Sequence, residues 1–405
     1  MFWARSILAQ DGAGFLCEKE GGSGVRLEHY IPVGKERLRC GYTTGTCAAA
    51  AARGAAEYLL TGRCPAAVEI RTPAGICVTA ELEEVCRGGD WASCAVRKDG
   101  GDDPDVTDGI LIYAKAVCRP AGGIVIAGGA GVGRVTRPGL DQPVGEAAIN
   151  STPRRMIRAE CEAALKAAGV SCGLTVTISA PAGVGLAAKT FNPRLGIEGG
   201  ISILGTSGIV RPMSEAALVD SLYLELDQLY ARGGRDVLVT PGNYGADFAR
   251  TDLGLSLQNL CSCSNYLGNC IDYAAGKGFR SFLLVSHLGK LSKVAAGNFN
   301  THSAVSDGRR ESLCTHAALS GGAGAVIRDL YDCVTTEAAL DRLRAAGLLE
   351  DTLESLMGAL DAHLTARAGG MTIGAVAFTK QHGLLAMTPG AAALLPLHRG
   401  EEETR

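Results

Sequence analysis

The sequence has few aromatic residues and no large excess of charge of either sign. Aromatic residues make up 5% of the 405 residues, and 39 Lys plus Arg stand against 42 Asp plus Glu, for a formal net charge of −3. A general nucleic-acid-binding protein normally carries a basic excess or a basic stripe. That class is therefore excluded, and a charged ligand must be recognised by local groups of residues.

Long hydrophobic runs are also missing. The longest apolar stretches, residues 47–52 and 122–133, are too short or too rich in glycine to cross a bilayer. Residues 1–10 lack the apolar segment and the cleavage site of a signal peptide. We therefore expect a cytoplasmic protein that has no membrane partner.

The 15 cysteines do not form a recognisable metal-binding pattern. Their number is odd, and a disulfide framework is not expected in a cytoplasmic chain of this size. The tightest group, Cys261, Cys263 and Cys270, lacks the C-x2-C pair and further ligands typical of zinc and iron–sulfur sites. We interpret these residues as buried or free thiols, and we expect no protein-bound metal.

The first half of the chain alternates strand and helix signals. A helix is predicted from about Thr46, with Thr44 or Thr46 as N-cap and Gly62 after its end. The runs 68–70 and 76–78 flank a turn and predict a hairpin. A second helix is predicted over 150–169, with Thr152 as cap, Pro153 at its first position and Gly169 as its stop. Alternating apolar residues predict a half-exposed strand over 174–180.

The pattern changes after about residue 200. Residues 201–204, 237–239 and 282–285 are apolar runs without alternation, and each precedes a glycine-containing loop and a helix, which is typical of buried parallel strands. Helices are predicted over 214–232, with Ser214 as cap, and over 336–367, and a late strand over 374–378. The predicted fold is a mixed α+β domain followed by a parallel-sheet α/β domain. The expected divisions are an extension (1–36), the mixed domain (37–195), the α/β domain (196–330) and a C-terminal segment (331–405) that returns to either domain.

Three blocks of residues carry more chemistry than these elements require. The first block is residues 41–47, where Thr43, Thr44 and Thr46 lie at the start of the predicted helix. Hydroxyl and free N–H groups at a helix start can form either an anion site or a structural cap. The second, residues 98–108, contains Asp102, Asp103 and Asp105, which could act as acids and bases, bind a metal, or form a solvated turn. It lacks the spacing of an EF-hand.

The third block, residues 131–155, brings four arginines close to flexible backbone. Arginine binds carboxylates through two parallel hydrogen bonds, so this block suits a substrate with many carboxylates. The four residues are Arg134, Arg137, Arg154 and Arg155. A further dense segment, residues 190–200, runs directly into 201–212.

These blocks, in this order, resemble the cobalt-precorrin-5B C1-methyltransferase family of anaerobic cobalamin biosynthesis. Further matching blocks lie at residues 240–245, 263–265, 287–291 and 299–303, so the resemblance covers about 37–315. It implies S-adenosylmethionine-dependent methylation of C1 of a cobalt-corrin precursor, giving cobalt-precorrin-6A, with a fold unlike that of the other corrin-ring methyltransferases. The family pattern has Thr-His-Gly where this sequence has Thr107-Asp108-Gly109, and glycine where it has Ser286.

The resemblance and the predicted sheet together suggest site residues. Ligands of open α/β sheets bind beyond the carboxyl ends of the strands, so the loops 205–208, 240–247 and 287–290 are candidate contacts for the methyl donor. The residues predicted to bind S-adenosylmethionine are Gly242, Asn243, Gly245 and Asp247, with Thr206 and Ser207 nearby.

A corrin precursor carries acetate and propionate groups, so Arg194 and Arg211 join the four arginines above as predicted substrate-binding residues. The threonines of the first block, Thr43, Thr44 and Thr46, are also predicted to bind the substrate. His302 and His287 are candidates for handling a proton or facing the cobalt, because histidine titrates near neutrality and binds metals. Cobalt is expected only as part of this tetrapyrrole substrate.

Two other functions stay open at this point. A tetrapyrrole-binding protein without methyl transfer would keep the same fold. A phosphoryl-transfer enzyme would use the loop 43–47 as its anion site, but the G-x4-G-K-[ST] signature is missing. The sequence also leaves open homo-oligomer formation, the identity of any general base and the use of a cobalt-free substrate.

Overall fold

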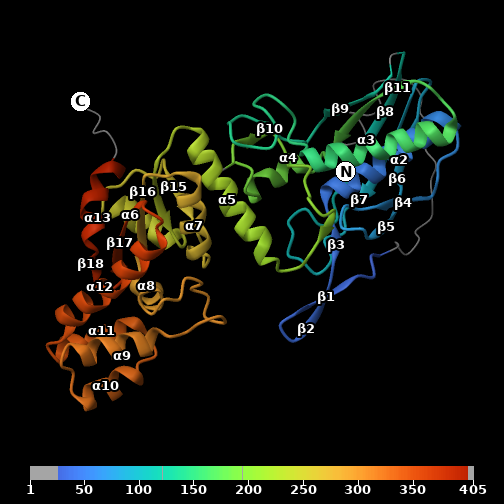
Figure 1. Cartoon of the computed structure of the whole chain (residues 1–405). Helices are drawn as coiled ribbons and strands as arrows, with labels where there is room; N and C mark the ends of the chain where they lie inside the picture. Colours follow the sequence, from blue (N-terminus) through green and yellow to red (C-terminus); the bar gives the residue numbers. More distant parts are fainter. Residues whose placement is uncertain (1–25, 121, 194, 400–405) are drawn as a thin grey trace. The chain divides into compact units, whose positions relative to one another are not determined.

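A computed structural model describes residues 26–120, 122–193 and 195–399, which form two compact units divided between Glu215 and Ala216 (Figure 1). The predicted boundary lay at 195/196, so residues 196–215 belong to the first unit instead. The predicted extension (1–36) contains β1 (Tyr30–Val33), which pairs with β2 (Glu36–Arg39) in a two-stranded sheet of its own. Residues 1–25 lie outside the described residues.

The first unit is built on a five-stranded sheet in the order β6-β7-β8-β11-β9. Its strands are β6 (Glu83–Arg87), β7 (Trp91–Arg97), β8 (Leu111–Arg119), β9 (Ile124–Gly128) and β11 (Gly173–Ser179). All neighbours are antiparallel except β9 and β11. The predicted strand 174–180 is β11, and the predicted hairpin is β4 (Ala67–Arg71) paired with β5 (Cys77–Glu81). Both predictions are confirmed.

Two helices pack beside this sheet, α2 (Thr44–Thr61) and α3 (Ser151–Ala168) (Figure 1). The alanine run of α2 is fully buried, because small side chains allow the helix to lie close to both α3 and the sheet. Gly62 and Gly169 end the helices in the left-handed conformation, as predicted.

The predicted caps of these helices were wrong by one to three residues. The N-cap of α2 is Thr43, whose side chain accepts from the Thr46 amide, and the N-cap of α3 is Asn150. Both residues have extended backbone, which an N-cap requires, whereas Thr44 and Thr152 are already helical. Pro153 is accordingly the third helical residue.

Residues 201–204 were predicted as a strand of the second domain, and this was wrong. Ile201 and Ile203 are buried in the first unit, where they form isolated parallel bridges to Val132 and Ile149.

Short elements complete the first unit. They are β3 (Gly41–Tyr42) paired with β13 (Ile209–Val210), β10 (Arg134–Val135) paired with β12 (Ile197–Glu198), α4 (Gly183–Leu186) and a 3-10 turn η1 (Ala187–Lys189).

The second unit contains another five-stranded sheet, in the order β15-β14-β16-β17-β18. Its strands are β14 (Asp236–Thr240), β15 (Leu260–Ser262), β16 (Ser281–His287), β17 (Thr372–Thr379) and β18 (Gly383–Met387). The neighbours are parallel except β17 and β18. The predicted parallel strands at 237–239 and 282–285 are confirmed, and the late strand pairs with β16, so the C-terminal segment belongs to this unit.

Helices cover both faces of this sheet, which explains the unbroken apolar runs. Phe282 and Leu284 share a core with α5 (Glu215–Ala231), α7 (Leu267–Lys277), α8 (Leu288–Ala295) and α12 (Leu349–Arg367). Leu283 and Val285 pack in a separate core with α6 (Asn243–Thr251) and α13 (Pro389–Leu394). The remaining helices are α9 (Arg309–Leu319), α10 (Gly324–Tyr331), α11 (Thr336–Ala345) and η2 (Leu395–His398). The predicted helix over 336–367 is therefore two helices, α11 and α12.

Cys261, Cys263 and Cys270 are fully buried free thiols in the larger of these cores. Burial raises the pKa of the Cys263 thiol to about 12, so this residue is neutral at physiological pH. The interpretation of these three cysteines as buried or free thiols is confirmed.

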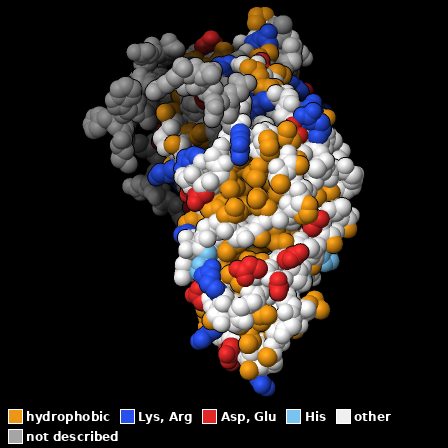
Figure 2. Space-filling model, turned by 90° about the vertical axis from the view of Figure 1, so that its left-hand side faces the viewer, with side chains coloured by type: hydrophobic (Ala, Val, Ile, Leu, Met, Phe, Trp, Pro, Cys, Tyr) orange, Lys and Arg blue, Asp and Glu red, His pale blue; other side chains and the backbone are white. Residues whose placement is uncertain are grey.

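One face of the second unit carries exposed apolar side chains. Figure 2 shows a band of hydrophobic side chains on the side where β18 lies in Figure 1, and Leu384 and Met387 of this edge strand are exposed.

The helices of the described residues are too short or too polar to span a membrane. Formation of a homo-oligomer stays a prediction.

Candidate functional site

The strand order of the second unit indicates where a ligand would bind. β14 comes first in the chain, β15 lies on one side of it and β16 on the other, so the winding direction reverses between β14 and β16. Open α/β sheets bind ligands beyond the carboxyl ends of the strands at such a switch point. The loops 240–243 and 287–290 leave the sheet there and form the candidate site.

The loop after β14 presents open backbone at the start of α6. A Cβ on Gly242 would meet nothing within 4 Å, and within the described residues no acceptor is found for the N–H groups of Asn243 and Tyr244. The hydroxyl of Thr240 is buried without a hydrogen-bond partner. These groups could receive the polar atoms of a ligand.

Gly245 has a packing role in this loop. A Cβ at this position would lie 2.8 Å from the Val285 carbonyl oxygen, so glycine allows α6 to approach β16. Asp247 is exposed and pairs with Arg250 at 3.1 Å, one turn further along the helix.

Thr206 and Ser207 do not belong to this sheet. The loop that holds them is part of the first unit, where the Ala74 amide donates to the Ser207 carbonyl oxygen at 3.0 Å. The Ser207 hydroxyl accepts from the Ile209 amide at 3.2 Å. The prediction that these residues follow the first parallel strand was wrong, because residues 201–204 are not in that sheet.

His287 holds the start of α8. Its Nδ1 accepts from the Gly289 amide at 3.1 Å, and its Nε2 lies 3.2 Å from Glu337 Oε1. Both ring nitrogens thus have protein partners, so the contacts favour a positioning role for His287 over proton transfer. His302 also caps a turn, with Nδ1 accepting from the Ala304 amide at 3.2 Å.

Two lysines near the switch point were not predicted. Lys290 Nζ donates to the Ser264 carbonyl oxygen at 3.1 Å and to Asn265 Oδ1 at 3.0 Å. Lys293 is buried, and its Nζ donates to the Thr301 carbonyl oxygen at 3.1 Å. For Lys290 a signal was present, because it belongs to the block 287–291, which the fold brings together with 263–265 and 299–303. Spacing alone gave it no role, and Lys293 lies outside these blocks.

The threonine block of the first unit fastens a distant segment to α2. The Thr44 hydroxyl accepts from the Leu204 amide at 2.9 Å, and the Thr46 hydroxyl donates to the Gly208 carbonyl oxygen at 2.7 Å. Thr43 caps the helix, and the Gly45 amide donates to the Leu204 carbonyl oxygen at 3.0 Å. The side chains are buried and these donors have partners, so the contacts support the structural interpretation over an anion site.

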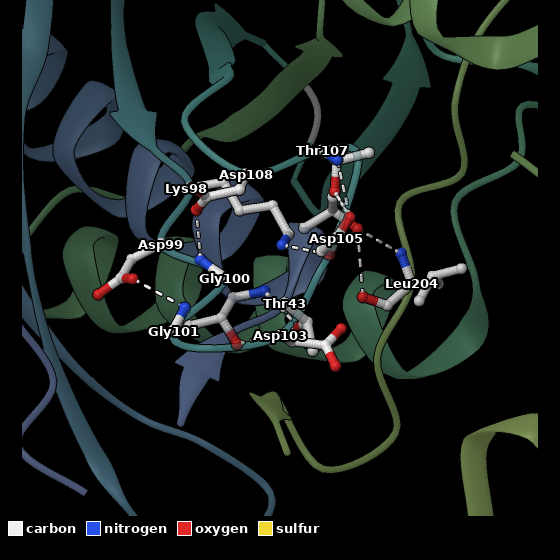
Figure 3. A network of polar contacts seen from close by, with 12 residues as sticks. Thr43, Lys98, Asp99, Gly100, Gly101, Asp103, Asp105, Thr107, Asp108 and Leu204 are labelled. Carbon is white, nitrogen blue, oxygen red and sulfur yellow. Dashed lines mark hydrogen bonds and ion pairs between the residues drawn. The ribbon is translucent and has the colours of Figure 1, made fainter. Parts of the chain in front are cut away.

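The acidic loop is held together by its own carboxylates (Figure 3). Lys98 is buried, and its Nζ lies 2.6 Å from Asp105. Asp105 also accepts from the amide and hydroxyl of Thr107. Asp108, which stands where the family pattern has histidine, accepts from the Gly100 amide at 2.7 Å.

Asp102 and Asp103 connect this loop to other segments. Asp102 accepts from the Arg39 amide at 2.6 Å, and Asp103 accepts from the Met213 amide at 2.9 Å. In residues 26–399, less 121 and 194, no cluster of three or more His, Cys, Asp or Glu could hold a metal ion. The described contacts therefore favour a structural role for Asp102, Asp103 and Asp105 over acid–base catalysis.

We expect the first unit to lose stability in acid. Burial raises the pKa of Asp105, but Lys98 and the Thr107 hydrogen bonds outweigh it and hold this pKa below its usual value. The stabilisation is then complete above about pH 4 and is lost as the pH falls through the folded pKa. Between pH 6 and pH 3, the urea concentration at the unfolding midpoint should depend less on pH in D105N than in the unaltered protein. An equal dependence in both proteins would contradict this.

Five of the six predicted arginines are described. Arg154 Nε donates to the Ile149 carbonyl oxygen at 2.8 Å and its side chain lies 3.6 Å from Glu146, which is a structural role. Arg137 packs against Gly196. Within the described residues Arg134, Arg155 and Arg211 are exposed and lack a carboxylate at ion-pair distance. Arg194 lies outside the described residues.

The chain is similar to known proteins along most of its length. The profile of the CbiD family matches residues 31–212, and that of the CbiD C-terminal domain matches residues 300–389. A protein of Ruminiclostridium cellulolyticum named cobalt-precorrin-5B C(1)-methyltransferase is 45% identical over 84% of this chain and 89% of its own. One of the same name from Alkaliphilus metalliredigens is 42% identical over 93% of this chain and 99% of its own.

A solved structure is also similar. It is described as the cobalamin biosynthesis protein cbiD of Archaeoglobus fulgidus, and it is 29% identical, with a TM-score of 0.37. The match covers 70% of this chain and 87% of that chain.

Proposed function

Because this chain belongs to the CbiD family, we propose that it is a methyltransferase that methylates C1 of cobalt-precorrin-5B with S-adenosylmethionine as donor, giving cobalt-precorrin-6A. The observation that carries the proposal is the similarity, at 45% identity over 84% of the chain, to a protein named for this reaction. Cobalt enters with the substrate. A biosynthetic reaction on a free small molecule is consistent with a cytoplasmic location.

The second unit offers groups that fit the donor. S-adenosylmethionine supplies, when bound, a methyl group on a sulfonium centre, whose thioether leaving group needs no proton. The work of the protein is then mainly to bind and orient two reactants. We propose that the donor is contacted by the open backbone at Gly242, by the N–H groups of Asn243 and Tyr244, and by the exposed side chains of Asn243 and Asp247.

The first unit offers groups that fit the substrate. Arg134, Arg155 and Arg211 are exposed without carboxylate partners within the described residues, and a guanidinium binds a carboxylate through two hydrogen bonds. We propose that these three bind acetate or propionate groups, whereas Arg154 supports the loop that precedes α3.

Calorimetric binding of S-adenosylmethionine and S-adenosylhomocysteine to the full chain tests the donor site. We expect both to bind, and we expect N243A and D247A each to weaken binding roughly tenfold, the effect of losing one hydrogen bond to a charged or polar ligand group. R280A is a control, because Arg280 lies at the opposite, amino end of β16.

The alternative, a tetrapyrrole-binding protein without methyl transfer, predicts a different result. It requires binding of a cobalt-corrin precursor with no binding of either S-adenosyl compound, alone or together with the precursor. Normal donor affinity in N243A and D247A would instead reject the loop after β14 as the donor site.

A further inference from the structure

The loops beyond the carboxyl end of the second sheet contain a positive charge without a counter-charge. Lys293 lies 3.6 Å from Asp307, and Arg309 lies 2.7 Å from the same carboxylate. Lys290, one turn before Lys293, has no carboxylate within 4 Å among the described residues. Burial lowers the pKa of Lys290, and the charge of Lys293 acts in the same direction. An anionic ligand would remove this imbalance.

The contacts of Lys290 leave hydrogen-bond donors available beside this charge. An ammonium group has three N–H donors, and two neutral acceptors are found, the Ser264 carbonyl oxygen and Asn265 Oδ1. Asn265 Oδ1 also accepts from the Thr301 hydroxyl at 3.2 Å. Nδ2 of Asn265 has no acceptor among the described residues. One ammonium N–H and one amide NH2 are thus free to bind acceptors.

The backbone of this loop is held in an unfavourable conformation. Ser264 has a φ of +51°, a left-handed conformation that is unfavourable for a residue with a side chain. Such conformations persist where surrounding contacts impose them, and they are concentrated at ligand sites. Here the positive φ occurs at the residue whose carbonyl oxygen Lys290 contacts.

The sheet topology places these donors at the switch point. Lys290 belongs to α8, which follows β16, and its ammonium contacts the loop after β15, while β14 lies between those two strands. The side chain therefore crosses the carboxyl end of β14. The same end carries the Thr240 carbonyl oxygen, which accepts from the Cys263 amide at 3.0 Å, and then the open loop at Gly242.

We infer that Lys290 and Asn265 form the subsite for the carboxylate of the methyl donor's amino-acid moiety. This assignment rests on the proposed function. A carboxylate would accept from the free N–H of Lys290 and from the Asn265 amide, and it would balance the charge that the protein leaves uncompensated. The adenosyl part would then extend toward the loop after β14.

Two ligands that differ in the amino-acid moiety test the assignment with the full chain. S-adenosylhomocysteine has the carboxylate, whereas 5′-methylthioadenosine keeps the nucleoside and thioether but lacks it. We expect K290M to weaken binding of S-adenosylhomocysteine at least tenfold in calorimetry, and to leave 5′-methylthioadenosine within about twofold. The expected size is that of one hydrogen bond between charged groups. K277M is the matched control, since Lys277 pairs with Asp227 at 2.6 Å, and it should change neither affinity.

A second variant keeps the test valid if K290M fails to fold. N265D is nearly isosteric and places a carboxylate beside Lys290, so it should compete with the ligand's carboxylate and weaken only S-adenosylhomocysteine. Equal losses for both ligands, or no loss for either, would overturn the assignment, and an unchanged affinity would point to a substrate carboxylate as the partner of Lys290. Failure of the unaltered protein to bind S-adenosylhomocysteine would overturn the donor site itself, and the subsite with it.

Discussion

G131A should destabilise the first unit by about 4 kcal/mol. Gly131 has a φ of +74°, and a Cβ there would lie 1.8 Å from the Ala180 carbonyl oxygen. The left-handed conformation costs about 1–2 kcal/mol, and forcing two backbone segments apart adds about 1–3 kcal/mol. The segments cannot separate easily, because the Ala180 amide donates to the carbonyl oxygen of Ala130, the residue before Gly131, at 2.8 Å.

Urea unfolding followed by tryptophan fluorescence measures this loss in the first unit. Trp91 is buried in β7 of the first unit, so its fluorescence follows the unfolding of that unit. G75A is the matched control, because Gly75 has a φ of +79° but open space around a Cβ. We expect G75A to cost only about 1–2 kcal/mol. Equal losses in the two variants would show that the predicted clash is absent.

K98M should destabilise the same unit by about 3 kcal/mol. Lys98 is 3% exposed and its ammonium lies 2.6 Å from Asp105. Removing one partner of a buried ion pair costs about 3–5 kcal/mol, because the other charge stays buried without compensation. The Asp105 side chain is 23% exposed, so water and Thr107 reduce the loss to the lower end of that range.

The double variant K98M/D105N distinguishes two causes of the stability loss in K98M: the Asp105 charge left without its partner, and the lost packing of the Lys98 side chain. It should be more stable than K98M, since no buried carboxylate is left without its partner. R97M is the control for a surface pair, because Arg97 and Glu83 are 54% and 35% exposed. It should cost less than about 1 kcal/mol. A K98M protein as stable as R97M would contradict the importance of the buried pair, and the same fluorescence assay decides.

The local elements were predictable because their signals are local. Glycine ends α2 and α3 since a left-handed residue is needed there, and the hairpin of β4 and β5 follows from two apolar runs around a turn. The runs at 237–239 and 282–285 predicted buried parallel strands because helices cover both faces. The segment 201–204 has the same apolar character but joins the first unit, since an apolar run specifies burial and not the partner.

The candidate site was only partly predictable for the same reason. The two loops that follow β14 and β16, and the family, were predictable from the chain alone, because the order of its motifs does not depend on the fold. Which polar residues have partners within the protein became known only from the folded structure. In the folded chain, Thr44, Asp105 and His287 have hydrogen-bond or ion-pair partners, whereas Lys290 has no carboxylate partner among the described residues. Hydrogen bonds and ion pairs join residues far apart in the chain, so their presence or absence is fixed by the fold and cannot be read from spacing.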